Sequence, residues 1–120
     1  MGNLPGKFTK KDTANRCTLL VEQGKLSLRK DSPHKRDVAP EGANLSNEQW
    51  QQIQQVVESE FVKTSSFAGP PFGKDPHKDK AYQVMQRLQS QYGLQFTYMS
   101  FWDNYHIGGK CWCYCITVQW

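Results

Sequence analysis

The strict alternation of side chains from Lys110 to Trp120 constrains the fold more than any other feature of this chain. Because neighbouring side chains of a β-strand point to opposite faces, the alternation predicts a strand. Burial of large aromatic side chains dominates the energetics of a core, so we expect the aromatic face to point inward. That face carries Trp112, Tyr114, Ile116, Val118 and Trp120, and the other carries Cys111, Cys113, Cys115, Thr117 and Gln119.

An earlier segment, residues 16–29, has the pattern of a β-hairpin. A two-residue loop at Gln23 and Gly24 would place Val21 opposite Leu26, with the glycine supplying a positive φ. Apolar residues then share one face and oppositely charged residues meet on the other. Register, turn type and charge pairing therefore agree with one another.

Two helices are predicted between these strand signals. The first begins at Ser46, which with Gln49 forms a capping box. The second begins at Asp75 with Pro76 in its first turn, and Gly93 ends it. The apolar stripe of the first helix is Trp50, Ile53, Val57 and Phe61, and that of the second is Ala81, Met85, Leu88 and Tyr92.

Residues 95–102 alternate again and predict one more strand, so the expected order is ββ-αα-ββ. Helices and strands that are segregated along the chain favour an α+β fold. We therefore expect an N-terminal hairpin and two helices packed on a small antiparallel sheet. The parts of this single domain are a disordered tail (1–15), the hairpin (16–29), a linker (30–44) and an α+β core (45–120).

Positive charge is concentrated near the start of the chain. Residues 1–44 carry nine basic and five acidic side chains, which accounts for the whole net charge of +4. Such a segment attracts phosphate groups or anionic lipid, or it is simply a solvated tail. Met1-Gly2 begins a partial myristoylation signal, so membrane association would depend on acylation of Gly2. The candidate phosphate or lipid contacts are Lys7, Lys10, Lys11 and Arg16.

The least common feature of the sequence is the spacing Cys111-x-Cys113-x-Cys115. Cysteine thiolates bind zinc, and His106 or Cys17 would have to complete such a site. Ligands two residues apart on a strand diverge, however, and free cysteines also pack as small hydrophobic residues. No secretory signal is visible, so we expect a reducing, cytoplasmic compartment without disulfides.

No arrangement of residues in the sequence is typical of an active site, so we expect a protein that is not an enzyme and has no cofactor. The long, uncharged terminal strand favours pairing with another chain. The preferred hypothesis is an adaptor that binds another protein or peptide through a sheet edge and an aromatic surface, and that forms a homodimer. The expected binding residues are Trp102, Tyr105, Trp112, Tyr114 and Trp120.

Two other functions stay open at this point. Aromatic side chains beside a basic segment could bind RNA or single-stranded nucleic acid. The cysteine-rich strand could instead belong to a structural zinc or thiol protein. A short chain of this kind would also suit a viral accessory or host-directed protein.

Overall fold

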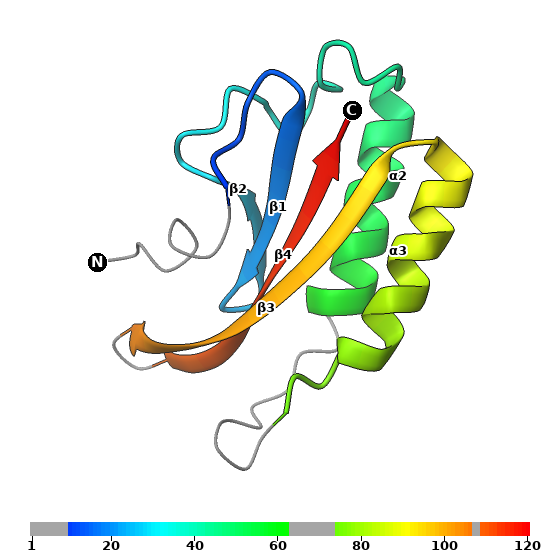
Figure 1. The fold of residues 1–120 in the computed structure, drawn as a ribbon. Coiled ribbons are helices and arrows are strands. Elements are labelled where there is room, and N and C mark those ends of the chain that lie inside the picture. Colours follow the sequence, from blue (N-terminus) through cyan, green and yellow to red (C-terminus); the bar gives the residue numbers. More distant parts are fainter. Residues whose placement is uncertain (1–9, 63–73, 107–108) are drawn as a thin grey trace.

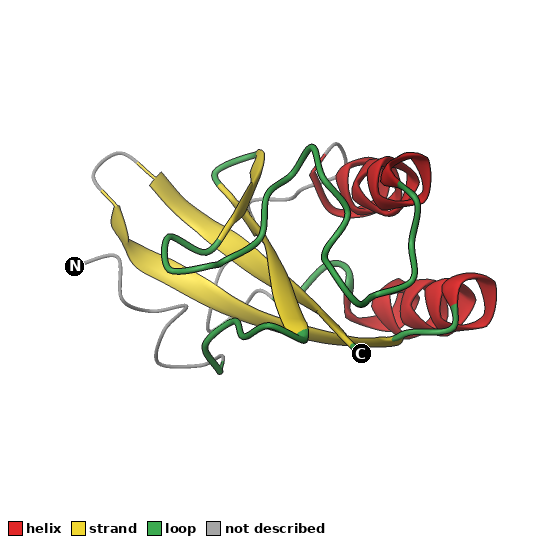
Figure 2. Cartoon of the chain, turned by 90° about the horizontal axis from the view of Figure 1, so that it is seen from above, coloured by secondary structure: helices red, strands yellow, loops and turns green. Residues whose placement is uncertain are grey.

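A twisted antiparallel sheet and a layer of two helices build an α+β fold, which confirms the predicted class (Figures 1 and 2). The computed structural model describes residues 10–62, 74–106 and 109–120. The strands are β1 (Arg16–Glu22), β2 (Lys25–Leu28), β3 (Gln95–His106) and β4 (Gly109–Gln119). The helices are α2 (Asn47–Val57), which a π-helical turn η1 (Glu58–Val62) continues, and α3 (Lys78–Tyr92).

The strand order in the sheet is β2-β1-β4-β3, so the first hairpin and the last two strands belong to one sheet. The prediction that the terminal strand lies at a sheet edge is wrong. From Tyr114 to Gln119, β4 is paired with β1 on one side and with β3 on the other, and only residues 109–113 extend past β1. Side-chain alternation reveals the two faces of a strand, but it carries no information about the neighbours along its two edges.

The β1–β2 turn follows from two backbone conformations. Gln23 and Gly24 have φ values of 52° and 72°, as a two-residue hairpin turn of type I′ requires. The turn pairs Val21 with Leu26 on the face toward the helices and Glu22 with Lys25 on the other.

The core lies between the helices and one face of the sheet. Trp50, Ile53, Val57 and Phe61 are fully buried, and the sheet contributes Leu19, Val21, Phe96, Tyr114, Ile116 and Val118. The predicted capping box begins α2, with Ser46 Oγ accepting from the Gln49 N–H at 3.0 Å. Helix α3 begins at Lys78, three residues later than predicted, because the Asp75 carboxylate accepts from the His77 N–H in a local turn.

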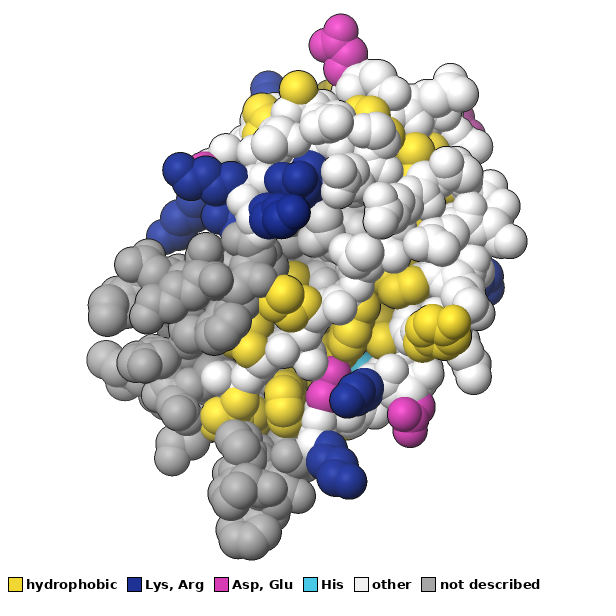
Figure 3. Space-filling model, in the orientation of Figure 1, with side chains coloured by type: hydrophobic (Ala, Val, Ile, Leu, Met, Phe, Trp, Pro, Cys, Tyr) yellow, Lys and Arg dark blue, Asp and Glu magenta, His cyan; other side chains and the backbone are white. Residues whose placement is uncertain are grey.

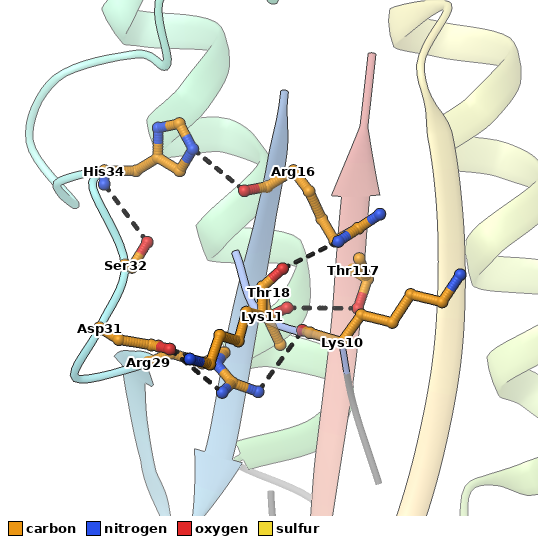
Figure 4. A network of polar contacts seen from close by, with 9 residues as sticks. All are labelled: Lys10, Lys11, Arg16, Thr18, Arg29, Asp31, Ser32, His34 and Thr117. Atoms are coloured by element: carbon orange, nitrogen blue, oxygen red, sulfur yellow. Dashed lines mark hydrogen bonds and ion pairs between the residues drawn. The ribbon is translucent and has the colours of Figure 1, made fainter. Parts of the chain in front are cut away.

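Residues 10–15 pack on the sheet, although the sequence predicted a disordered tail through residue 15. Thr13 and Arg16 exchange two backbone hydrogen bonds, and a ring nitrogen of His34 lies 2.7 Å from the Thr13 carbonyl oxygen. Figure 4 shows neighbouring polar contacts. A ring nitrogen of His34 lies 3.0 Å from the Arg16 carbonyl oxygen, and the Arg16 guanidinium is bonded to the Lys11 carbonyl oxygen on the face of β1 and β4 that points away from the helices. The predictions for Gly2 and Lys7 lie outside the described residues.

The predicted linker, residues 30–44, is held against α2 by hydrogen bonds. Trp50 Nε1 donates to the Lys35 carbonyl oxygen at 3.0 Å, and Gln54 Nε2 donates to the Arg36 carbonyl oxygen at 2.7 Å. The loop thus satisfies the polar atoms of two buried helix side chains. Neither described helix is long and apolar enough to cross a membrane.

Candidate functional site

The outer edge of β3 presents backbone groups that the described sheet leaves without a strand partner. Strand β3 pairs only with β4, and the Phe96 N–H points the other way, to Gln89 Oε1 at 3.2 Å. In an antiparallel strand the N–H and C=O of one residue point to the same side, and this side alternates along the chain. Tyr98 and Ser100 therefore direct their backbone groups outward as well.

A hollow of about 450 Å³ lies beside this edge, between β3 and α3. Helix α3 contributes Lys78, Tyr82, Met85, Gln86 and Gln89, and β3 contributes Phe96, Thr97 and Tyr98. Tyr82 is 68% exposed, and Met99 on the opposite face of β3 is 38% exposed. Figure 3 shows hydrophobic side chains gathered over β3 and the first turns of α3, with basic and acidic side chains next to them.

The edge from Gln95 to Trp102 contains no charged residue and no proline. Natural sheets protect exposed edges with lysine, proline, a bulge or a covering segment. In β3 the register shifts only between Asp103 and His106, beyond this stretch. The stretch beside the hollow therefore lacks a charge, a proline and a bulge that would hinder pairing with another strand.

A buried aromatic cluster holds the centre of the edge in place. The Tyr98 hydroxyl donates to Asp75 at 2.6 Å, and burial together with this carboxylate raises the pKa of Tyr98. The His77 ring packs against Phe61 and Tyr114, with centroid distances of 5.6 and 5.0 Å. Burial lowers the pKa of His77, so the cluster consists of a protonated phenol and a neutral imidazole at neutral pH.

The aromatic residues predicted to bind a partner do not form one exposed surface. Tyr114 is fully buried in the core. Trp102 and Trp112 face each other across β3 and β4, with ring centroids 5.6 Å apart. Trp120 is half-buried and donates from Nε1 to the Glu41 carbonyl oxygen at 3.2 Å. The side chain of Tyr105 lies outside the described residues.

The cysteines are divided between the two faces of the sheet. Cys17 faces the helices, opposite Val118, whereas Cys113 and Cys115 are buried on the other face. Cys17 therefore cannot complete a zinc site with those two residues. Burial raises the pKa of Cys17 and of Cys115 to about 12, so both thiols keep their proton at neutral pH.

No group of three potential metal ligands occurs in the part of the chain that the structure describes. The side chains of Cys111 and His106 lie outside that part. The predicted zinc set of Cys111, Cys113, Cys115 and His106 is thus only half described, and it stays an untested prediction.

Three of the four predicted basic contacts lie close together on the face of the sheet away from the helices (Figure 4). Arg16 Nη1 donates to the Lys11 carbonyl oxygen at 2.8 Å, and Arg29 Nη1 donates to that of Lys10 at 3.5 Å. These bonds hold the backbone of the segment against the sheet and leave the ammonium groups of Lys10 and Lys11 near its surface. Lys7 and Gly2 lie outside the described ranges.

Comparison with known proteins found no matching family model, no matching curated protein and no matching solved structure.

Sequence reasoning missed the residues that border the β3 edge, above all Gln89 and Lys78. One signal was present, because Gln95 to Trp102 is uncharged and rich in aromatic residues, as is the terminal strand after Lys110. That signal alone could not show which of the two strands is internal.

Proposed function

We propose that this chain is a non-enzymatic interaction module that binds an extended segment of another protein along the outer edge of β3. The observation that supports the proposal is the bond from the Phe96 N–H to Gln89, which fixes the outward direction of the Tyr98 and Ser100 backbone. An added strand would satisfy these groups and extend the sheet, as in other cases of strand addition.

The same edge also suits a homodimer, in which the β3 strands of two copies pair. Because the stretch from Gln95 to Trp102 carries no charge, two copies would meet there without like-charge repulsion. We further propose a cytoplasmic location, which the free thiols of Cys17 and Cys115 support.

The test replaces Ser100 by proline. Proline removes the outward N–H and adds a ring at the edge, and an edge strand tolerates it because this N–H makes no bond to β4. Ser100→Ala is the matched control, since it loses the same hydroxyl but keeps the N–H. Circular dichroism and thermal unfolding establish that both variants fold.

Two probes are used with these variants, namely sedimentation velocity of the chain alone and selection from a displayed library of random dodecapeptides. We expect wild type and Ser100→Ala to self-associate or to select peptides, and Ser100→Pro to do neither. A folded Ser100→Pro variant that retains the wild-type behaviour in both assays would falsify the proposal.

A second candidate function is binding of single-stranded nucleic acid, which the cluster of Lys10, Lys11 and Arg16 favours. Contacts to phosphate make such binding fall steeply with salt. Titration of a fluorescent oligonucleotide at low and high salt tests it, with Lys10→Glu/Lys11→Glu as the variant. Equal, salt-independent signals from both proteins would exclude this function.

A further inference from the structure

We infer that Lys78 makes the β3 edge selective for extended segments with an aspartate or glutamate opposite Tyr98. This inference rests on the proposed function, since it assumes that a segment pairs with β3. It adds a chemical class of partner, namely an acidic β-strand.

The two ends of the hollow differ in what they offer an added strand. Helix α3 leads into β3 through a turn at Gly93, so the last turns of the helix lie beside Phe96 and the first turn lies beside Tyr98. At the Phe96 end, Gln89 already occupies the outward N–H. Pairing is therefore first available at Tyr98, which is the end where Lys78 borders the hollow.

Lys78 is the only charged residue among the described residues that border this hollow. It is exposed and makes no ion pair within the described ranges. Asp79 follows Lys78 directly in the sequence and forms no ion pair with it in the described part of the chain. Asp75, three residues before Lys78, is bonded to the Tyr98 hydroxyl and the His77 N–H. Lys78 therefore has no ion-pair partner among the described residues, and its ammonium group is available to a carboxylate of an added strand.

The direction of side chains in a sheet decides which residue of the added strand meets this charge. Residues directly opposite each other on paired strands share a face. The side chain opposite Tyr98 would therefore lie on the helix side of the sheet, over the hollow and next to Lys78. Its two neighbours would lie on the other face beside Thr97 and Met99, where apolar or β-branched side chains fit.

The experiment selects dodecapeptides from a random displayed library on three forms of the full chain: wild type, Lys78→Glu and Lys30→Glu. Lys30 is exposed in the loop after β2 and away from the hollow, so its reversal matches the change in net charge. We expect wild type and Lys30→Glu to enrich peptides with an acidic residue at one fixed position between apolar residues. Lys78→Glu should enrich lysine or arginine at that position.

A synthetic peptide from the wild-type selection gives the quantitative test. We expect it to bind Lys78→Glu about tenfold more weakly than wild type, because an attraction is replaced by a repulsion. Lys78→Gln, which keeps the chain length, should bind it with lower affinity than wild type and with little dependence on salt.

The outcomes separate the two proposals. Peptides that require the β3 edge, as shown by loss of binding in Ser100→Pro, but carry no acidic preference would overturn the inference about Lys78 alone. Peptides that bind Ser100→Pro and wild type with equal affinity would overturn both the proposal of binding at the β3 edge and the inference about Lys78. A selection that enriches no peptide would do the same.

Discussion

His77 shows how one buried side chain ties the site to the stability of the fold. The residue is only 3% exposed and its ring packs against Phe61 and Tyr114. Its Nε2 atom has no hydrogen-bond partner in the described part of the chain. Burial, followed by the positive charge of Lys80, lowers its pKa, while Asp75 and Glu60 act in the opposite direction. The native state therefore binds a proton at His77 less readily than the unfolded chain does.

We predict from this pKa that the protein loses stability as the pH falls below about 6.5, the ordinary pKa of histidine. Between that value and the lowered native pKa, the unfolded chain binds more protons than the native state, and the free energy of unfolding decreases. The His77→Phe variant keeps a ring in the cluster and lacks this contribution. Urea unfolding at several pH values should give a shallower decline for the variant than for wild type, and equal declines would show that other groups cause the pH dependence.

The hydrogen bond between the Tyr98 hydroxyl and Asp75 supports the edge. The hydroxyl donates to Asp75 at 2.6 Å, and hydrogen bonds to charged acceptors contribute about 1.5–3 kcal/mol. We predict that Tyr98→Phe lowers the free energy of unfolding by roughly 1–2 kcal/mol, since Asp75 retains its bond from the His77 N–H. Urea unfolding measures the change. Tyr82→Phe, at an exposed position on α3, is the control and should change stability by less than about 0.5 kcal/mol.

At the scale of single elements, the capping box of α2 allows a direct test of local sequence effects. Ser46 Oγ accepts from the Gln49 N–H, while the Gln49 side chain accepts from the Ser46 N–H at 2.9 Å. We predict that Ser46→Ala lowers the free energy of unfolding by about 1 kcal/mol, because the first turn loses an acceptor. Ser90→Ala, at an exposed site within α3, should be neutral or slightly stabilising, because alanine has the higher helix propensity. The same loss in both variants would contradict the assignment to the cap.

Local patterns identified the elements of this fold better than its edges. The capping box, the Trp50 to Phe61 stripe and the inward aromatic face of β4 all depend on short-range chemistry that the sequence displays. The position of β4 depends on its pairing with β1, nearly a chain length away, and no local pattern encodes it. For the same reason the sequence placed the binding edge on the terminal strand, whereas β3 carries the open edge.

The site was predictable only in part. The uncharged stretch of β3 is visible in the sequence, but the hollow requires that α3 turn back along β3, with Gln89 reaching the Phe96 N–H. From the sequence alone, Lys78 and Tyr82 are expected to be ordinary residues on the polar face of a helix. The spacing of the cysteines suggests metal chemistry, whereas Cys17 and Cys115 are buried and keep their protons.

The whole molecule depends on the hairpin that precedes the predicted core. Strand β1 pairs with β4 from Arg16↔Gln119 to Val21↔Tyr114 and contributes buried residues beneath the helices. We predict that a fragment of residues 45–120 does not fold, because β4 would lose its pairing with β1 and the core would lose the buried side chains of β1. A fragment of residues 10–120 retains every described contact and should give the dispersed amide spectrum of a folded protein. A dispersed NMR spectrum from the shorter fragment would refute this prediction.

The adjacency of β1 and β4 has a consequence for biosynthesis. A ribosome releases the β1–β2 hairpin long before it releases the residues that pair with it, and contacts between remote segments form late. During that interval the edge of β1 that pairs with β4 has no partner, and the apolar face of the hairpin is not covered by the helices. A chaperone that masks exposed strands during translation would therefore be expected to raise the yield of native protein in the cell.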